Sequence, residues 1–420
     1  MESTAIICYK RRRINRSTRR NIPECMLFEV LIRLPVKVLF KLKVVSKQWF
    51  SMISDPCFAR MYVSRASLSP HDSQHWTLIH SRVDHMATMD HFLVKKVRLH
   101  ECSIATDCLQ NRLILPRAAQ GSDHTIYRIN GVSDGLVLYS PPDDVGCLAP
   151  RGRIFGGYIC NLITGKCITL PPYKHFFGNV IVGFVTRVQD NVLVSYRVVL
   201  TDSRTMDGIC RFVVFLSESS KWVEFDMHYE EDIYIYGWKK PVVFNKILHR
   251  MISQHRLMAY DPYSLKLDSF RMISLPDVED EGDKIAESLL DENQGKLRFF
   301  VVTLKGSRSF IIWALNDYDR GEWCLQHRVG LGNIRSTDGG RLSLFTVPLS
   351  FHPSHPETVY MIDDDFIFCY NINTKASKIL DASNKNYRCR FPRCYLYSFL
   401  IPTWPTSINS PSFQIAAAGD

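Results

Sequence analysis

The chain has 420 residues, of which 46% are hydrophobic and 22% are charged, with 21 glycines and 20 prolines. These values are ordinary for a globular protein and exclude a mostly disordered, collagen-like or low-complexity chain. The length favours a small module beside one large domain. The formal net charge of +10 has a meaning only once its location is known.

The positive charge is concentrated in the first 21 residues. They hold seven basic side chains against the single acid Glu2, a formal charge of +6 that leaves +4 for the other 399 residues. We interpret this arm as disordered, and three functions stay open: nuclear import, nonspecific nucleic-acid contact, or solubility. Only Tyr9 is available for base stacking, which argues against a nucleic-acid partner. The candidate import signal consists of Lys10, Arg11, Arg12, Arg13, Arg19 and Arg20.

No export signal or membrane span is expected. Charge appears at Lys10 before an apolar signal core has formed, and no run of 18 apolar residues follows. The sequence therefore predicts an intracellular protein, in the nucleus, the cytoplasm or both, without a membrane partner. The 13 cysteines occur without a C-x-x-C pair. We expect them to be small buried hydrophobes in a reducing compartment.

Residues 22–66 have helical periodicity. Pro23 suits a first helical position, and apolar residues then follow at i, i+3, i+4 and i+7 along one helix face: Leu27, Val30, Leu31 and Leu34. Pro35 ends this helix. A second helical phase has apolar spacings of 4, 3 and 4 before the break at residues 54–56: Val38, Leu42, Val45 and Trp49. A module of about 45 residues is too small to be very stable alone, so a partner is expected.

Residues 67–75 form a polar connector, after which the period changes to that of strands. Five histidines lie in and after the connector, without an acidic residue at the spacing of a zinc-protease motif, so we expect them to be solvated. They are His71, His75, His80, His85 and His91. One exception to the strand pattern is Lys284 to Leu290, which has a helical pattern inside an acidic stretch and predicts a surface excursion.

The strand region contains an internal repeat of a strand, a polar turn and a second strand. Its copies cover residues 159–171, 213–222, 258–276, 312–323 and 368–380. The turn residues Asn161, Glu218, Asp261, Asp317 and Asn371 are separated by 57, 43, 56 and 54 residues. Intervals of this size predict a β-propeller, because no blade buries both faces of its sheet without neighbours. The alternative is a set of hairpins in one or two sandwiches.

Sequence signatures of common enzymes are missing. There is no phosphate-binding loop, no dinucleotide fingerprint and no G-x-S-x-G motif. The segments His352-Pro-Ser-His355 and Asp363-Asp364-Asp365 have the composition of turns between strands. The sequence therefore predicts no catalytic residue, metal or cofactor.

The helical module resembles an F-box. The segment Ile22-Pro-Glu-Cys-Met-Leu-Phe-Glu-Val-Leu-Ile-Arg-Leu-Pro35 is similar to the opening of plant F-boxes, and the segment that follows ends in the V-S-K-x-W signature at Trp49. Two residues depart from the family pattern: Cys25 replaces an acid, and Phe50 replaces a polar or basic residue. The rest resembles the F-box-associated interaction domain of the large plant family, through the N-x-x-T-G segment ending at Pro171, the Leu315–Trp323 unit and Leu400-Ile-Pro-Thr-Trp-Pro405.

The resemblance implies a small all-α F-box module followed by an all-β repeat domain, an irregular, kelch-like β-propeller. The implied parts are an arm (1–21), an F-box (22–66), a connector (67–75), a β-propeller-like domain (76–405) and a C-terminal tail (406–420).

The implied function is that of a non-catalytic substrate receptor of an SCF-type, cullin-RING ubiquitin ligase. It would dock on a Skp-type adaptor, and through it on cullin, while the β domain holds a target protein that the sequence does not identify. The residues implied in adaptor binding are Ile22, Pro23, Leu27, Val30, Leu31, Leu34, Pro35, Val36, Leu39, Val45 and Trp49. The alternatives are a propeller-fold enzyme and a nucleic-acid-binding protein that uses the basic arm.

Overall fold

The computed structural model describes residues 23–67, 76–83, 128–140, 153–175, 180–202, 208–228, 239–264, 270–277, 285–303, 309–330, 346–353, 355–363, 366–381, 393–400 and 404–408. The basic arm with its candidate import signal, Ile22, and four of the five clustered histidines lie outside these residues; His80 belongs to a strand. The chain divides near Tyr62 into a helical unit and a β domain. Within the described ranges no helix is long and apolar enough to cross a membrane.

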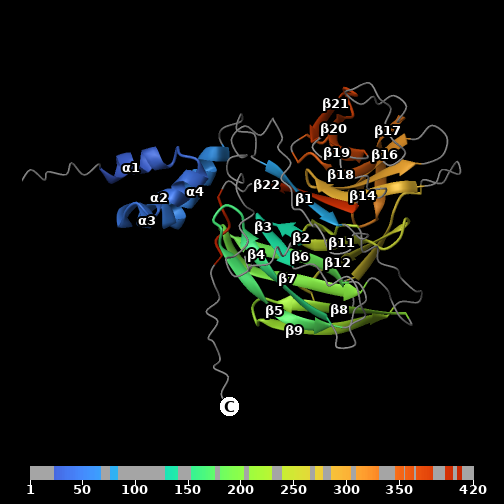
Figure 1. Cartoon of the computed structure of the whole chain (residues 1–420), viewed down its shortest axis with the longest axis horizontal. Helices are drawn as coiled ribbons and strands as arrows, with labels where there is room; N and C mark the ends of the chain where they lie inside the picture. Colours follow the sequence, from blue (N-terminus) through green and yellow to red (C-terminus); the bar gives the residue numbers. More distant parts are fainter. Residues whose placement is uncertain are drawn as a thin grey trace, which may run out of the picture. The chain divides into compact units, whose positions relative to one another are not determined.

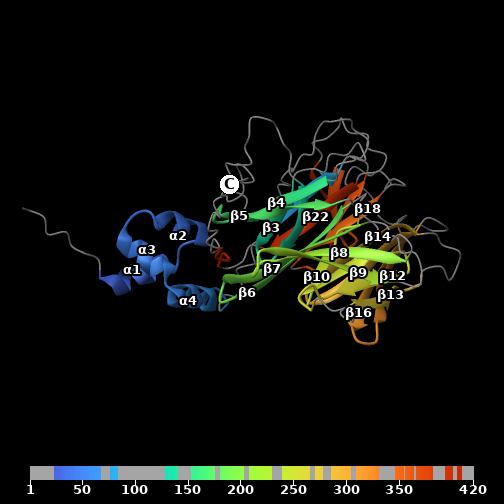
Figure 2. The same ribbon diagram turned by 90° about the horizontal axis from the view of Figure 1, so that it is seen from below.

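The helical unit contains α1 (Glu24–Leu31), α2 (Val36–Leu42), α3 (Lys47–Ser54) and α4 (Pro56–Ser67) (Figure 2). A proline stands directly before α1 and before α2, as its fixed φ favours. The second helical phase is divided into two helices, because Ser46 caps α3 by accepting a hydrogen bond from Trp49 N at 3.1 Å. The predicted break at residues 54–56 separates α3 from α4.

The core of the helical unit is small. Its buried side chains are Leu27, Leu31, Ile32, Leu39, Met52, Ile53, Phe58 and Ala59. The rings of Phe28 and Phe58 meet edge to face with centroids 5.1 Å apart, which joins α1 to α4. The Tyr62 hydroxyl donates to Leu34 O at 3.0 Å and fixes α4 to the turn between α1 and α2.

The β domain contains five antiparallel four-stranded sheets, here called blades 1 to 5 in chain order (Figure 1). Blade 1 consists of β2 (Arg128–Ser133), β3 (Leu136–Ser140), β4 (Arg153–Asn161) and β5 (Cys167–His175). Blade 2 consists of β6 (Val180–Gln189), β7 (Val192–Asp202), β8 (Ile209–Leu216) and β9 (Lys221–His228). Blade 3 consists of β10 (Val242–Phe244), β11 (Ile247–Met251), β12 (Arg256–Tyr260) and β13 (Phe270–Ser274). Blade 4 consists of β14 (Ile285–Asn293), β15 (Lys296–Thr303), β16 (Ser309–Asp317) and β17 (Glu322–Gly330). Blade 5 consists of β18 (Val347–Phe351), β19 (Thr358–Asp363), β20 (Phe366–Asn371) and β21 (Ser377–Asp381).

The ring is closed by strands far apart in the sequence. β1 (Trp76–Val83) pairs antiparallel with β22 (Arg393–Leu400), from Trp76 opposite Leu400 to Val83 opposite Arg393. Figure 1 shows the blue β1 beside the red β22. β22 contacts β18 of blade 5 and β2 of blade 1, so the first and last blades meet through it. This closed arrangement confirms the predicted β-propeller.

The predicted repeat coincides with the third and fourth strands of each blade. Asn161 Oδ1 accepts hydrogen bonds from the N–H groups of Ile163 at 2.9 Å and Thr164 at 3.0 Å. Asp261, Asp317 and Asn371 likewise accept from an N–H two or three residues further on. The repeat therefore arises from the local chemistry of Asx-type turns. Glu218 differs, since it pairs with Arg197.

Tryptophans join neighbouring blades at the outer strands. Trp222 Nε1 donates to Pro171 O at 3.1 Å, from β9 to β5 of the preceding blade. Trp323 Nε1 donates in the same way to Ser274 O at 2.8 Å, from β17 to β13. Each tryptophan copy of the repeat is thus attached to the Leu-Pro copy before it. Apolar clusters fill the spaces between blades 1 and 2, 2 and 3, 3 and 4, and 4 and 5.

Two expectations are wrong. The segment Lys284 to Leu290 is not a helix, because residues 285–293 form β14. Leu289 packs in the cluster shared with blade 5 and Leu290 in the cluster shared with blade 3. Adjacent apolar residues on opposite faces of a doubly buried strand imitate a helical pattern.

The cysteines are also not uniformly buried and unpaired. Cys210 is buried, but Cys25, Cys57 and Cys324 are exposed. Cys160 and Cys167 lie opposite each other on β4 and β5 and form a disulfide. The two cysteines are brought together by the register of the β4–β5 hairpin. A search for C-x-x-C pairs does not find them, because they are seven residues apart.

The segments expected as turns lie between strands of blade 5, and residues 354, 364 and 365 lie outside the described residues. The segment His352 to His355 lies between β18 and β19, and Asp363 ends β19. Residues 404–408 pack against the β domain, where Ile408 joins the cluster between blades 1 and 2.

Candidate functional site

The helical unit exposes an unusual number of large apolar side chains. Eleven such side chains are exposed among the described residues, and seven of them lie in this unit: Met26, Val30, Val38, Val44, Val45, Phe50 and Met61. Val44 is 89% exposed and Met26 is 60% exposed. Apolar surface gathered in this way indicates a protein interaction site.

The eleven residues implied in adaptor binding divide between core and surface. Leu27, Leu31 and Leu39 are buried in the core. Leu34, Val36 and Trp49 are half-buried. Pro23, Val30, Pro35 and Val45 are exposed, and Ile22 lies outside the described residues. The division agrees with the small size of the unit, which cannot enclose every apolar side chain it carries.

Five exposed apolar residues were not among those implied: Met26, Val38, Val44, Phe50 and Met61. Met26 had a detectable signal, because it precedes Val30 by four residues and therefore lies on the same face of α1. Val44 is adjacent to Val45 in the turn after α2, where helical periodicity no longer predicts exposure. We call the exposed residues of α1, α2 and the start of α3 the apolar surface: Met26, Val30, Val38, Val44, Val45 and Phe50.

The sequence that carries the α2 and α3 part of the apolar surface is basic. Between Val30 and Ser54 the sequence contains no aspartate or glutamate but five basic residues: Arg33, Lys37, Lys41, Lys43 and Lys47. Lys43 Nζ lies 4.4 Å from the ring centre of Phe40 and 5.9 Å from that of Phe50, a cation–π arrangement. A partner suited to this surface combines apolar contacts with acidic side chains.

The two departures from the family pattern leave the core intact. Cys25 is exposed on α1, and Phe50 is 55% exposed on α3. Neither side chain contributes to the buried set of the helical unit. Phe50 instead adds apolar area next to Trp49.

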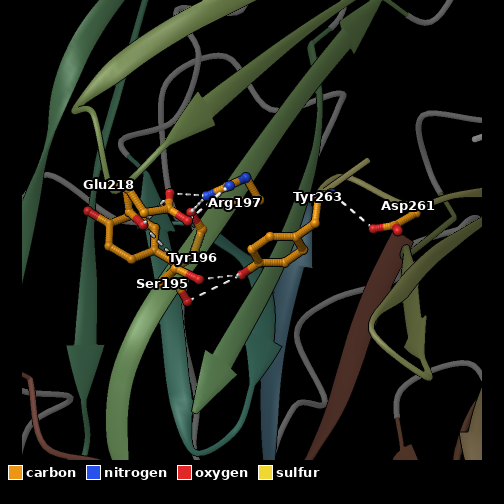
Figure 3. A network of polar contacts seen from close by, with 7 residues as sticks. Ser195, Tyr196, Arg197, Glu218, Asp261 and Tyr263 are labelled. Atoms are coloured by element: carbon orange, nitrogen blue, oxygen red, sulfur yellow. Dashed lines mark hydrogen bonds and ion pairs between the residues drawn. The ribbon is translucent and has the colours of Figure 1, made fainter. Parts of the chain in front are cut away.

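A polar network joins blades 2 and 3 of the β domain (Figure 3). The side chain of Arg197 is 9% exposed and pairs with both carboxylate oxygens of Glu218. Its guanidinium carbon lies 4.3 Å from the ring centre of Tyr263, while that of Arg187 lies at 3.7 Å. Tyr263 therefore stacks with two cations and holds the turn of blade 3 to β6 and β7.

Charge controls the ionisation of this network. Burial alone acts to raise the pKa of Glu218, but the hydrogen bond and positive charge of Arg197 outweigh it, so this pKa is lowered. Burial raises the pKa of Tyr263. The pair is thus ionised and the phenol neutral at physiological pH, an arrangement suited to joining blades.

A second polar group lies at the inner strands. Lys240 Nζ is 2.9 Å from Asp291 Oδ1, and the two side chains are 6% and 9% exposed. Asp291 Oδ2 also accepts from Ser350 Oγ at 2.6 Å and from Phe351 N at 3.1 Å. One carboxylate therefore connects blades 3, 4 and 5. The pair borders a cavity of about 120 Å³ that Gly131 and other residues of the inner strands line.

A buried histidine connects blades 3 and 4. His249 is fully buried, with Nδ1 3.1 Å from Ile247 O and Nε2 2.9 Å from the Tyr318 hydroxyl. Burial lowers the pKa of His249 to about 4, so the ring is neutral at physiological pH. Across the described part of the chain no three His, Cys, Asp or Glu side chains are grouped so as to hold a metal ion.

Comparison with known families agrees with this division into units. Residues 20–61 match the F-box domain. Residues 75–402 match the family described as F-box protein At3g26010-like, beta-propeller, which covers more than half of the chain. The chain belongs to the F-box proteins with an At3g26010-like β-propeller.

Several proteins of Arabidopsis thaliana resemble this F-box protein over nearly its whole length. Putative F-box protein At3g23970 is 25% identical, covering 94% of this chain and 96% of its own. F-box protein At3g26010 is 25% identical, covering 93% and 91%. Putative F-box/kelch-repeat protein At1g15680 is 24% identical, covering 94% and 96%. The similarity to these relatives therefore spans both the F-box and the propeller of this chain.

Proposed function

We propose that this F-box protein is a substrate receptor of an SCF-type ubiquitin ligase, which docks on a Skp-type adaptor through its helical unit. The observation that carries the proposal is the concentration of exposed apolar side chains on a unit with a small core. Fully burying one such side chain contributes about 1.5–3 kcal/mol, so a few contacts give stable docking after the costs of association. The family assignment of residues 20–61 supports the choice of partner.

In this role the β domain holds a target protein, and the receptor contributes proximity. Binding the target near the ligase raises its effective concentration at the transferred ubiquitin. The polar groups described in the β domain connect blades to one another, as the contacts of Arg197 and Asp291 show. These contacts support a non-catalytic receptor.

The proposal is tested by measuring the affinity of the full chain for a purified Skp-type adaptor. Val30→Asp and Val45→Asp change exposed residues, so they preserve the core while placing a charge in the interface. We expect each to weaken binding by at least about tenfold. The matched control is Val194→Asp on β7, because Val194 and Val30 are both 58% exposed. Equal affinity of all three variants and the unmodified chain would refute docking through the apolar surface.

Salt provides a second test. Because basic residues accompany the apolar residues of α2 and α3, we expect the affinity for the adaptor to fall as sodium chloride is raised. Lys43→Gln should weaken binding and reduce that salt dependence. An affinity independent of salt would argue that the basic residues do not face the adaptor.

A further inference from the structure

The segment after β22 packs against blades 1 and 2. Trp404 is 8% exposed, Thr406 is 3% exposed and Ile408 is 4% exposed, while the intervening Ser407 is exposed. We call Trp404–Ile408 the latch. Pro405 is buried as well, so Ser407 is the one exposed residue of the latch. Ser407 pairs through its backbone with Val192, so the latch is bound like a peptide.

The backbone of the latch pairs with Val192, the first residue of β7. Ser407 N donates to Asn191 O at 2.7 Å, and Leu193 N donates to Ser407 O at 3.0 Å. Together they form a parallel bridge between Ser407 and Val192. Addition of an extended segment to a strand is a general mode of peptide recognition, in which the main chain gives affinity and the side chains give specificity.

The two latch residues that flank Ser407, Thr406 and Ile408, also contact blades 1 and 2. The Thr406 hydroxyl donates to Asp134 O at 2.8 Å. Asn161 Nδ2 donates to Thr406 O at 2.8 Å. Ile408 enters the apolar cluster between blades 1 and 2. The latch site thus binds a residue with a hydroxyl group followed two positions later by an aliphatic residue.

The latch site is held in place by contacts that do not involve the latch. Asn161 Oδ1 is bound in its own turn by two backbone N–H groups. Asn371 of blade 5 makes the same turn, with bonds of 3.0 and 2.9 Å, and its Nδ2 makes no hydrogen bond to any described residue. The Asp134 carboxylate accepts from Lys246 at 2.6 Å and from Thr186 at 2.7 Å. A site organised in this way binds without the cost of ordering it first.

We propose that the latch site is a peptide-binding site, occupied by the latch in the same chain and open to an extended segment of another protein with the same hydroxyl-x-aliphatic pattern. The incoming segment displaces the latch, which lies beyond the last strand of the closing sheet. The proposal does not depend on the docking of the helical unit, because all of its contacts lie within the β domain.

The test uses the full chain and a fluorescein-labelled peptide with the sequence of residues 402–410, followed by fluorescence anisotropy. Ile408→Asp removes the latch from its site by placing a charge in the apolar cluster. We expect this variant to bind the peptide at least about tenfold more tightly than the unmodified chain, whose site is occupied. No adaptor is present in this assay. A failure to bind the peptide is therefore distinguishable from a failure of adaptor docking.

A matched pair of substitutions identifies the site. In the Ile408→Asp background, Asn161→Asp keeps the turn acceptor but removes the Nδ2 donor, and we expect peptide affinity to fall by about tenfold. Asn371→Asp makes the same change in the turn of blade 5 and should leave the affinity unchanged. Equal effects of the two substitutions would overturn the assignment.

Folding of the variants is checked by thermal unfolding. If Ile408→Asp is unfolded at the assay temperature, Thr406→Val replaces it, because this change is nearly isosteric and removes only the hydroxyl donor. A folded variant that binds the peptide no better than the unmodified chain overturns the proposal. Unfolding of both variants also overturns it, because a segment that the fold requires cannot be exchanged for a partner.

Discussion

Replacing Lys240 by methionine should destabilise the β domain through the charge that remains at Asp291. Both side chains of the pair are less than a tenth exposed. Removing one partner of a buried ion pair costs about 3–5 kcal/mol. Because Asp291 keeps its hydrogen bonds from Ser350 and Phe351, we expect the lower end, about 3 kcal/mol. Lys240→Met should therefore lower the thermal midpoint by roughly 6–12 °C, at about 2–4 °C per kcal/mol for a large domain.

The assay is chemical and thermal unfolding of the full chain, with Lys246→Met as the matched control. Lys246 also pairs with an aspartate, at 2.6 Å, but the two side chains are 46% and 32% exposed. An exposed pair contributes about 1 kcal/mol or less. The double variant Lys240→Met/Asp291→Asn should lose less stability than Lys240→Met alone, because the buried charge is gone. If Lys240→Met costs no more than Lys246→Met, the reasoning from burial is refuted.

Three further predictions concern contacts between strands and blades. The pKa of His249 is lowered to about 4 in the folded chain, whereas an unfolded histidine titrates near 6.5. As the pH falls, the unfolded chain takes up this proton first, so about 3 kcal/mol of stability present above pH 6.5 should be lost between pH 6.5 and 4; urea unfolding at several pH values should show a flatter dependence for His249→Gln. Trp323→Phe keeps the ring but removes a hydrogen bond between blades, and should lower the free energy of unfolding by about 1 kcal/mol in the same measurement; no change would show that the bond contributes nothing. A Cβ at Gly157 would lie 2.3 Å from Tyr139 O, whereas one at Gly156 would meet nothing within 4 Å. Gly157→Ala should therefore lower the thermal midpoint and Gly156→Ala should not, and equal midpoints would contradict the packing of β4 against β3.

The propeller was predictable because its repeat arises from contacts between residues close together in the sequence. Asn161 and Asn371 each hold a tight turn through contacts two and three residues away, so the spacing of such residues reports the spacing of blades. Trp222 and Trp323 mark the outer strands for a similar reason, since each makes one specific contact with the preceding blade.

Features that depend on register and on distant partners were not predictable. The strand β14 is buried on both faces, and its pattern lacks the alternation by which a strand is normally detected. The pairing of Cys160 with Cys167 requires the register of one hairpin. The latch depends on contacts with Asp134 and Asn161, both more than 240 residues away. Nothing in the local composition of the latch indicates these partners.

The helical unit shows the same limit on a smaller scale. Its size was enough to predict that some apolar residues stay exposed, and periodicity was enough to place Leu27 and Leu31 on one face. Periodicity did not separate Val30 from them, although Val30 is 58% exposed and Leu31 is fully buried. The separation depends on where α4 covers α1, which is a tertiary contact.

Because β1 pairs with β22, the two units are completed at different times during synthesis. Arg393 is added 310 residues after Val83, its partner in the closing sheet. At about 5–20 residues per second, the ribosome needs roughly 15–60 s for that interval. The helices precede β1 in the chain and have all their partners throughout this time, whereas the ring stays open until β22 emerges. The helical unit is therefore able to fold while the propeller is still incomplete on the ribosome.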